Sequence, residues 1–176
     1  GTYSYNPTPD TLVTMNKDHF VKGVQGNCWS EYMYTNDIRE YMTFPRALAV
    51  AEVGWTNNDR KDYKDFERRI NNAYVRMDAH HINYHIPMPE QLGGSCNFIA
   101  FIDTVSVSFK TSRPEKMVYT IDGTEPTAQS AEYTAPLTFK ETTTLKIATA
   151  LPSGKLSKVR TITVEKQTPL KAKEVA

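Results

Sequence analysis

Trp29 and Glu31 stand two positions apart at the end of the largely apolar run GVQGNCWSE, residues 23–31. Side chains two apart in an extended chain point to the same side. A flat indole ring offers an apolar face on which a sugar ring can stack, and a carboxylate accepts hydrogen bonds from hydroxyl groups. The two residues therefore predict one wall of a carbohydrate-binding site.

One buried strand and two helices are predicted to position this pair. The run from Phe20 to Glu31 lacks polar alternation, which favours a strand of a parallel sheet covered on both faces. Asn36 and Asp37 are plausible caps of the helix that follows. Pro45 is expected to split that helix, because proline removes a backbone donor and clashes with the preceding turn.

A second helix is predicted over about residues 61–81. Its apolar positions recur every three or four residues, as on a helix laid against a core. Its charged residues, which include Asp65, Arg68 and Arg69, are assigned to the solvent face. A strand followed by helices is typical of the last βα unit of an eight-stranded barrel, and one such unit cannot close the barrel.

The segments GVQGNCWSEY and EYMTFPRALAVAEVGW together resemble the end of the catalytic barrel of family-20 glycoside hydrolases, the β-N-acetylhexosaminidases. In that family the pattern reads roughly G-x-Q-x-x-x-W-x-E, followed by a helix with (F/W)-P-R-x-x-A-x-A-E-x-x-W. The resemblance implies that Trp29 packs on the sugar in the −1 subsite and that Glu31 accepts hydrogen bonds from its C4 and C6 hydroxyls. The alternative is a buried Trp29 that anchors a helix and a Glu31 that bridges to Arg46.

The resemblance also implies retaining hydrolysis in which the substrate's own 2-acetamido oxygen attacks the anomeric carbon. An Asp orients that group, and the adjacent Glu is the acid and base. No Asp-Glu dipeptide occurs in the 176 residues, so no catalytic residue is predicted in this chain. Residues 3–9 resemble the connection between the seventh and eighth barrel strands. The chain is therefore expected to be the C-terminal piece of an enzyme that removes terminal β-linked GlcNAc or GalNAc.

Arg46, Glu52 and Trp55 are predicted to support the site without binding the sugar. Arg46 lies on a mostly apolar helix and needs a carboxylate partner if it is buried. A structural ion pair is therefore expected for Arg46 and Glu52, and the alternative is that they hold the residues that touch the substrate. Trp55 closes the helix and is expected in the core, with contact to the substrate as the alternative.

No metal ion or cofactor is predicted. His80, His81 and His85 are spaced by one and then four, without a matching Cys or Glu ligand pattern. Asp122-Gly123 is typical of a hairpin turn rather than of a calcium loop.

Composition argues against several other classes of function. The net charge of +1 gives no electrostatic case for nucleic acid or an anionic membrane. No apolar run approaches the ~18 residues of a membrane helix, and the polar opening residues do not resemble a signal peptide. Secretion or periplasmic location is implied by the family resemblance alone. Cys28 and Cys96 could pair, but free thiols are favoured because a chain of this size needs no disulfide.

The C-terminal half changes character. Short runs of period-two alternation, separated by turns such as Asp122-Gly123 and Ser153-Gly154, are typical of a small antiparallel β-sandwich. Residues 119–137 resemble the C-terminal domain of chitobiases and bacterial β-hexosaminidases, which is a fibronectin-like module. The predicted organisation is the end of the (β/α)8 barrel at 1–86, a linker at 87–96, a β-sandwich at 97–168 and a tail at 169–176.

The sequence thus predicts an α/β unit followed by an all-β unit. The expected partners are glycans that contain N-acetylhexosamine and the N-terminal barrel portion of the same protein. Two other functions stay open: a non-catalytic carbohydrate-binding or adhesion module centred on the sandwich, and a purely structural domain. A preceding barrel with His-x-Gly-Gly-Asp-Glu would favour the enzyme.

Overall fold

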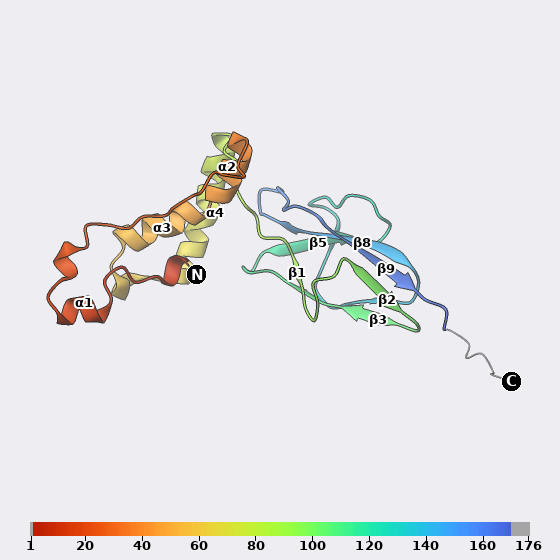
Figure 1. Ribbon diagram of the computed structural model, residues 1–176. Helices are drawn as coiled ribbons and strands as arrows, with labels where there is room; N and C mark the ends of the chain where they lie inside the picture. Colours follow the sequence, from red (N-terminus) through yellow and green to blue (C-terminus); the bar gives the residue numbers. More distant parts are fainter. Residues whose placement is uncertain (1, 170–176) are drawn as a thin grey trace. The chain divides into compact units, whose positions relative to one another are not determined.

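The computed structural model describes residues 2–169. The chain divides into two compact units, residues 1–85 and residues 86–176. The first unit is helical, and the second is built from strands (Figure 1). Of the predicted tail, residues 170–176 lie outside the described residues. The helices of the first unit are α1 (Asp10–Thr14), α2 (Asn36–Thr43), α3 (Arg46–Trp55) and α4 (Tyr63–Ala79), with single 3-10 turns at Thr2–Ser4, Asp18–Phe20 and Asn58–Arg60.

Helix α4 confirms the helix predicted over residues 61–81. It begins after Asp62, whose side chain accepts hydrogen bonds from the backbone N–H groups of Lys64 and Asp65 at 2.9 and 3.2 Å. Such a cap satisfies backbone donors that have no partner within the helix. The face with the three-and-four spacing is the buried one, as shown by Phe66, Ile70, Tyr74 and Met77.

The break at Pro45 is also confirmed, because α2 ends at Thr43 and α3 begins at Arg46. The cap of α2 is one residue earlier than predicted. Thr35 has extended backbone angles, and its hydroxyl oxygen accepts a hydrogen bond from the N–H of Ile38 at 3.3 Å. Asn36 and Asp37 lie inside the first turn of the helix instead.

The predicted buried strand over Phe20–Glu31 is wrong for this chain. Phe20 ends a 3-10 turn with 68% of its surface exposed, and residues 21–30 have no regular secondary structure. No residue in the described range 2–52 is buried. A parallel strand obtains both its hydrogen bonds and its burial from neighbouring strands, and the described part of the first unit contains none.

The second unit has a five-stranded sheet in the order β2-β9-β8-β5-β6 and two pairs, β1-β4 and β3-β7. The central strand β8 is antiparallel to both of its neighbours, β5 and β9. The strands pair antiparallel, as predicted, except at one edge, where β2 runs parallel to β9. The strands are β1 (Glu90–Gln91), β2 (Phe98–Phe101), β3 (Val105–Val107), β4 (Phe109–Lys110), β5 (Lys116–Thr120), β6 (Ala131–Glu132), β7 (Leu137–Phe139), β8 (Thr143–Ala150) and β9 (Arg160–Lys166).

One hydrophobic core joins the large sheet to the smaller strand pairs. Its buried residues are Phe101, Val107, Phe109, Phe139, Leu145, Ile147, Ile162 and Val164. The chain bends at both predicted turns, where Gly123 and Gly154 have φ angles of +80° and +86°, which glycine adopts without steric cost. Neither is a tight two-residue hairpin, because ten residues separate β5 from β6 and nine separate β8 from β9. The predicted linker contributes to this unit, because Glu90 and Gln91 pair with Lys110 and Phe109.

Candidate functional site

The segment that carries Trp29 lies along helix α3, as can be followed in Figure 1. Two glycines make the approach close. A Cβ atom at Gly26 would lie 3.1 Å from Cγ2 of Val50, and one at Gly54 would lie 2.9 Å from Cγ2 of Val24. Ordinary carbon contacts are longer than this. The segment is thus held against α3 by packing of glycine backbone against valine side chains rather than by sheet hydrogen bonds.

Trp29 and Glu31 both lie on the surface of the first unit. Trp29 exposes 72% of its surface, and Glu31 is exposed in a turn closed by the N–H of Met33, which donates to the carbonyl oxygen of Ser30 at 3.0 Å. Neither side chain makes a hydrogen bond or ion pair with another residue in the described range 2–169. The alternative of a buried Trp29 is wrong, so both side chains are available to a ligand.

A groove of about 600 Å³ lies between the segment and α3. Its lining is mostly apolar. Tyr5 and Cys28, the residue next to Trp29, are both part of that lining. The thiol of Cys28 lies 3.6 Å from the hydroxyl of Thr43. Cys28 and Cys96 are both free and exposed.

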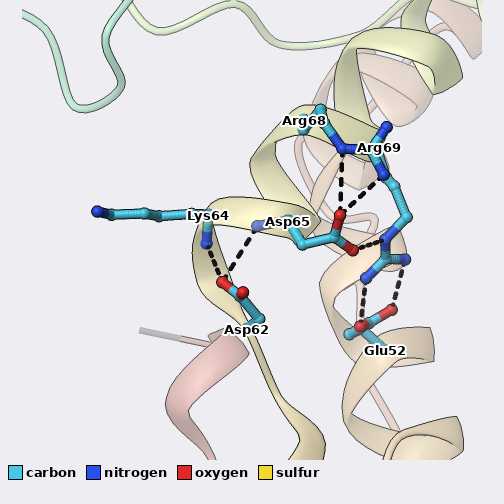
Figure 2. A network of polar contacts seen from close by, with 6 residues as sticks. All are labelled: Glu52, Asp62, Lys64, Asp65, Arg68 and Arg69. Carbon is cyan, nitrogen blue, oxygen red and sulfur yellow. Dashed lines mark hydrogen bonds and ion pairs between the residues drawn. The ribbon is translucent and has the colours of Figure 1, made fainter.

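Glu52 forms the predicted ion pair, but its partner is Arg69 of α4 rather than Arg46 (Figure 2). The two guanidinium nitrogens of Arg69 donate to the two oxygens of Glu52 at 3.0 and 2.5 Å. Arg46 instead donates to the backbone carbonyl oxygens of Tyr41 and Met42 at 3.3 and 3.0 Å. A carbonyl oxygen satisfies a guanidinium donor as a carboxylate does, so Arg46 needs no ion pair.

Asp65 extends this pair into a network. Its carboxylate accepts from Arg69 at 2.8 Å and from Arg68 at 3.1 and 2.8 Å. Hydrogen bonding to Arg69 lowers the pKa of Glu52, and the hydrogen bonds from Arg68 and Arg69 lower that of Asp65. The same carboxylates raise the pKa of Arg69. Glu52, Asp65 and Arg69 are therefore charged at neutral pH.

Trp55 is not in the core, which corrects the prediction. It is 91% exposed at the end of α3. It lines a groove of about 240 Å³ together with Phe66, Arg69 and Ile70 of α4. An apolar side chain at a helix end is buried only if another element covers that end, and in residues 2–169 none does so over this ring.

The contact of Arg69 with Glu52 was not predicted, because Arg69 was assigned to the solvent face of its helix. The signal available was its spacing of four from Asp65, which favours a helical ion pair. The spacing carries no information about Glu52, which lies 17 residues away.

The described residues contain no group of three or more His, Cys, Asp or Glu side chains that could hold a metal ion. Among the candidate histidines, His85 donates its backbone N–H to the carbonyl oxygen of Phe44 and its ring contacts Tyr41. Of the helices in residues 2–169, none combines the length and apolar character needed to cross a membrane.

Comparison with known proteins assigns both parts of the sequence. Residues 1–58 match the model of the glycosyl hydrolase family 20 catalytic domain, and residues 100–161 match that of the chitobiase/beta-hexosaminidase C-terminal domain. A beta-hexosaminidase of Porphyromonas gingivalis (strain ATCC BAA-308 / W83) is 55% identical over 94% of this chain and 21% of its own length.

Two further relatives match shorter stretches. A beta-hexosaminidase of Vibrio vulnificus is 52% identical over 43% of this chain and 9% of its own length. A beta-N-acetylhexosaminidase of Cellulomonas fimi is 34% identical over 38% of this chain and 14% of its own length. The chain therefore spans only a small part of the relatives that it matches. Residues 1–58 of this chain therefore belong to the glycosyl hydrolase family 20 catalytic domain family, and they precede a chitobiase/beta-hexosaminidase C-terminal domain at residues 100–161.

Proposed function

We propose that this chain is the C-terminal portion of an exo-β-N-acetylhexosaminidase that removes terminal β-linked GlcNAc or GalNAc. The observation that carries the proposal is the match of residues 1–58 to the family-20 catalytic domain, because this stretch contains Trp29 and Glu31. The relatives that match are named as hexosaminidases. The enzyme would act outside the cytoplasm, in the periplasm or in secreted form, on glycans that contain N-acetylhexosamine.

Trp29 and Glu31 are the proposed contribution to the −1 subsite. The exposed indole ring would stack on the sugar, and the carboxylate of Glu31 would accept hydrogen bonds from the C4 and C6 hydroxyls. Support comes from their position on one short exposed segment. No side chain in residues 2–169 makes a hydrogen bond or ion pair with either of them. An exposed, unpaired acceptor loses only water when a sugar hydroxyl binds it.

The catalytic groups would come from the rest of the enzyme. Substrate-assisted retaining hydrolysis needs one carboxyl group on the acetamido group and one on the leaving oxygen. The sequence has no adjacent Asp-Glu pair to supply them. This chain would therefore bind and orient the sugar, while the remaining barrel supplies the carboxyl group that acts as acid and base and the one that orients the acetamido group.

The remaining barrel is also the proposed partner of residues 1–85, which would form the last βα unit of a (β/α)8 barrel. Large apolar side chains of this unit are open to solvent, as expected for a surface that packs against another polypeptide. The aromatic ones that are more than half exposed are Tyr5, Phe20, Trp29, Tyr32, Tyr34 and Trp55. The second unit would be a fibronectin-like accessory domain.

Substitution in the intact enzyme tests the sugar-binding role. Trp29→Ala and Glu31→Gln should each lower kcat/KM by about ten- to a hundredfold, because hydrogen bonds to a charged group contribute about 1.5–3 kcal/mol and each 1.4 kcal/mol is a factor of ten. Glu141→Gln, a charge removal at an exposed side chain of the second unit, is the matched control. Near-wild-type kinetics for both site variants would refute the assignment.

A further inference from the structure

Helix α3 presents two opposite faces to two different neighbours. Val50 and Gly54 are four positions apart and share a face, which contacts the Trp29 segment. Glu52 is two positions from each of them, which on a helix of 3.6 residues per turn is a rotation of about 200°. Glu52 therefore points to the other side, where it meets Arg69 of α4. Helix α3 thus lies between the Trp29 segment and α4.

Beside the groove that separates them, α3 and the segment touch at two points that leave little room for adjustment. The closest approaches are at Gly26 and Gly54, where even a Cβ atom would be 3.1 and 2.9 Å from a valine methyl group. The valine side chains on the other side of these contacts, Val50 and Val24, are stiff because they branch at Cβ. Close-packed groups of this kind move together. A shift of α3 would therefore displace the segment that carries Trp29.

The Glu52–Arg69 pair joins α3 to α4 (Figure 2). The Glu52 side chain is only 12% exposed, and its two oxygens receive two hydrogen bonds from one planar guanidinium group. Such a bidentate pair defines direction as well as distance. Arg69 is itself oriented by Asp65, and its guanidinium carbon lies 5.8 Å from the centre of the Phe66 ring.

We propose that Arg69 is a positioning residue for sugar binding: by holding Glu52 it fixes α3, and α3 in turn fixes the segment that presents Trp29 and Glu31. The proposal rests on the proposed sugar-binding role of these two residues. It adds that the geometry of the −1 subsite wall is set from the far side of α3, by a residue that touches no substrate. Loss of the pair should therefore weaken sugar binding in protein that is still folded.

The test uses the full 176-residue chain with 5-fluorotryptophan at its two tryptophans, Trp29 and Trp55. Their fluorine NMR signals are assigned by replacing each tryptophan with Phe, and N-acetylglucosamine is titrated. In the wild-type chain the Trp29 signal should shift saturably. Arg69→Met should raise the dissociation constant by about tenfold, and Arg69→Lys, which keeps the charge but loses the planar fork, by about threefold.

Arg68→Met is the matched control, because Arg68 binds the same Asp65 on the same helix but does not contact Glu52. Its dissociation constant should stay within twofold of wild type. Glu52→Gln supplies the second arm of a double-mutant cycle. Combined with Arg69→Met it should weaken binding no further than Arg69→Met alone, since both changes remove one interaction.

The outcomes separate the two claims. A wild-type Trp29 signal that never responds to the sugar would refute sugar binding by this chain, and with it the positioning role of Arg69 in this chain. A wild-type response that Arg69→Met leaves unchanged would refute the positioning role alone, even if the melting temperature falls. If Arg69→Met has lost its helical circular dichroism, Arg69→Lys decides, and wild-type affinity in that variant would overturn the proposal.

Discussion

Tyr84→Phe removes one hydroxyl group from a buried junction of the first unit. Tyr84 is 2% exposed, and its ring stacks on Tyr74 of α4 with centroids 4.4 Å apart. Its hydroxyl group lies 2.9 Å from both carboxylate oxygens of Asp78, near the end of the same helix. This hydrogen bond joins Tyr84, in the chain that follows α4, to Asp78 of the helix. Phenylalanine keeps the stacked ring and deletes only the polar contact.

The expected cost at pH 7 is about 2 kcal/mol of unfolding free energy. A hydrogen bond to a charged group contributes about 1.5–3 kcal/mol. The ring volume is unchanged, so no cavity term is added. Tyr32→Phe is the matched control, because Tyr32 is 81% exposed. It should change the unfolding free energy by less than about 0.5 kcal/mol, as surface substitutions usually do.

The cost should also depend on pH. Burial, and after it the hydrogen bond to Asp78, raises the pKa of Tyr84 above its ordinary value of about 10. The folded state therefore keeps its proton at a pH where the unfolded chain has lost it. This stabilisation is complete below about pH 10 and declines as the pH rises further. Wild type should lose about 1.4 kcal/mol relative to Tyr84→Phe for each pH unit above that point.

Urea unfolding followed at 222 nm, where the helices of the first unit dominate the signal, measures both effects. The free-energy gap between wild type and Tyr84→Phe should be about 2 kcal/mol at pH 7 and should narrow between pH 9 and pH 11. Equal stability at pH 7 would refute the energetic role of the Asp78 contact. A gap that stays constant up to pH 11 would refute the reasoning about the raised pKa.

Three further predictions concern packing and catalysis. Ile162→Ala, at a fully buried position of β9, should cost about 2–5 kcal/mol in denaturant unfolding of the second unit, whereas Ile121→Ala, at a residue 53% exposed, should cost under about 1 kcal/mol; similar losses would contradict the core assignment. Gly54→Ala should displace the segment and change the fluorine NMR shift of 5-fluorotryptophan at Trp29, because its Cβ would meet Cγ2 of Val24 at 2.9 Å, and adding Val24→Ala should restore the shift; an unchanged shift would show that the segment does not depend on this contact. The chain by itself should not hydrolyse an aryl N-acetyl-β-glucosaminide, since it lacks an adjacent Asp-Glu pair, and turnover that survives removal of contaminating hexosaminidase would overturn the proposed division of labour.

Features that depend on neighbours in the chain were predicted well from the sequence. The extent of α4 follows from apolar residues every three or four positions, and the break before α3 follows from Pro45. Period-two runs located most strands of the second unit. Alternation by itself does not decide which face of β9 is buried: Ile162 and Val164 are buried, and Thr161 and Thr163 are not. A strand that alternates Thr with Val and Ile presents β-branched residues on both faces, so propensity alone does not choose between them.

Features that depend on distant parts of the chain were decided by the tertiary structure. The sequence alone determined that Trp29 and Glu31 form a motif, but their exposure and the absence of a strand beneath them follow from the lack of neighbouring strands in residues 2–85. The partner of Glu52 likewise depends on how α3 packs against α4, because 17 residues separate it from Arg69. Local sequence determines periodicity, caps and breaks, since these involve groups within about one turn of each other. Burial and ion-pair partners are determined only when separate elements meet in space. The sequence therefore singled out Trp29 and Glu31 as candidates, and the packing of α3 decided how they are held.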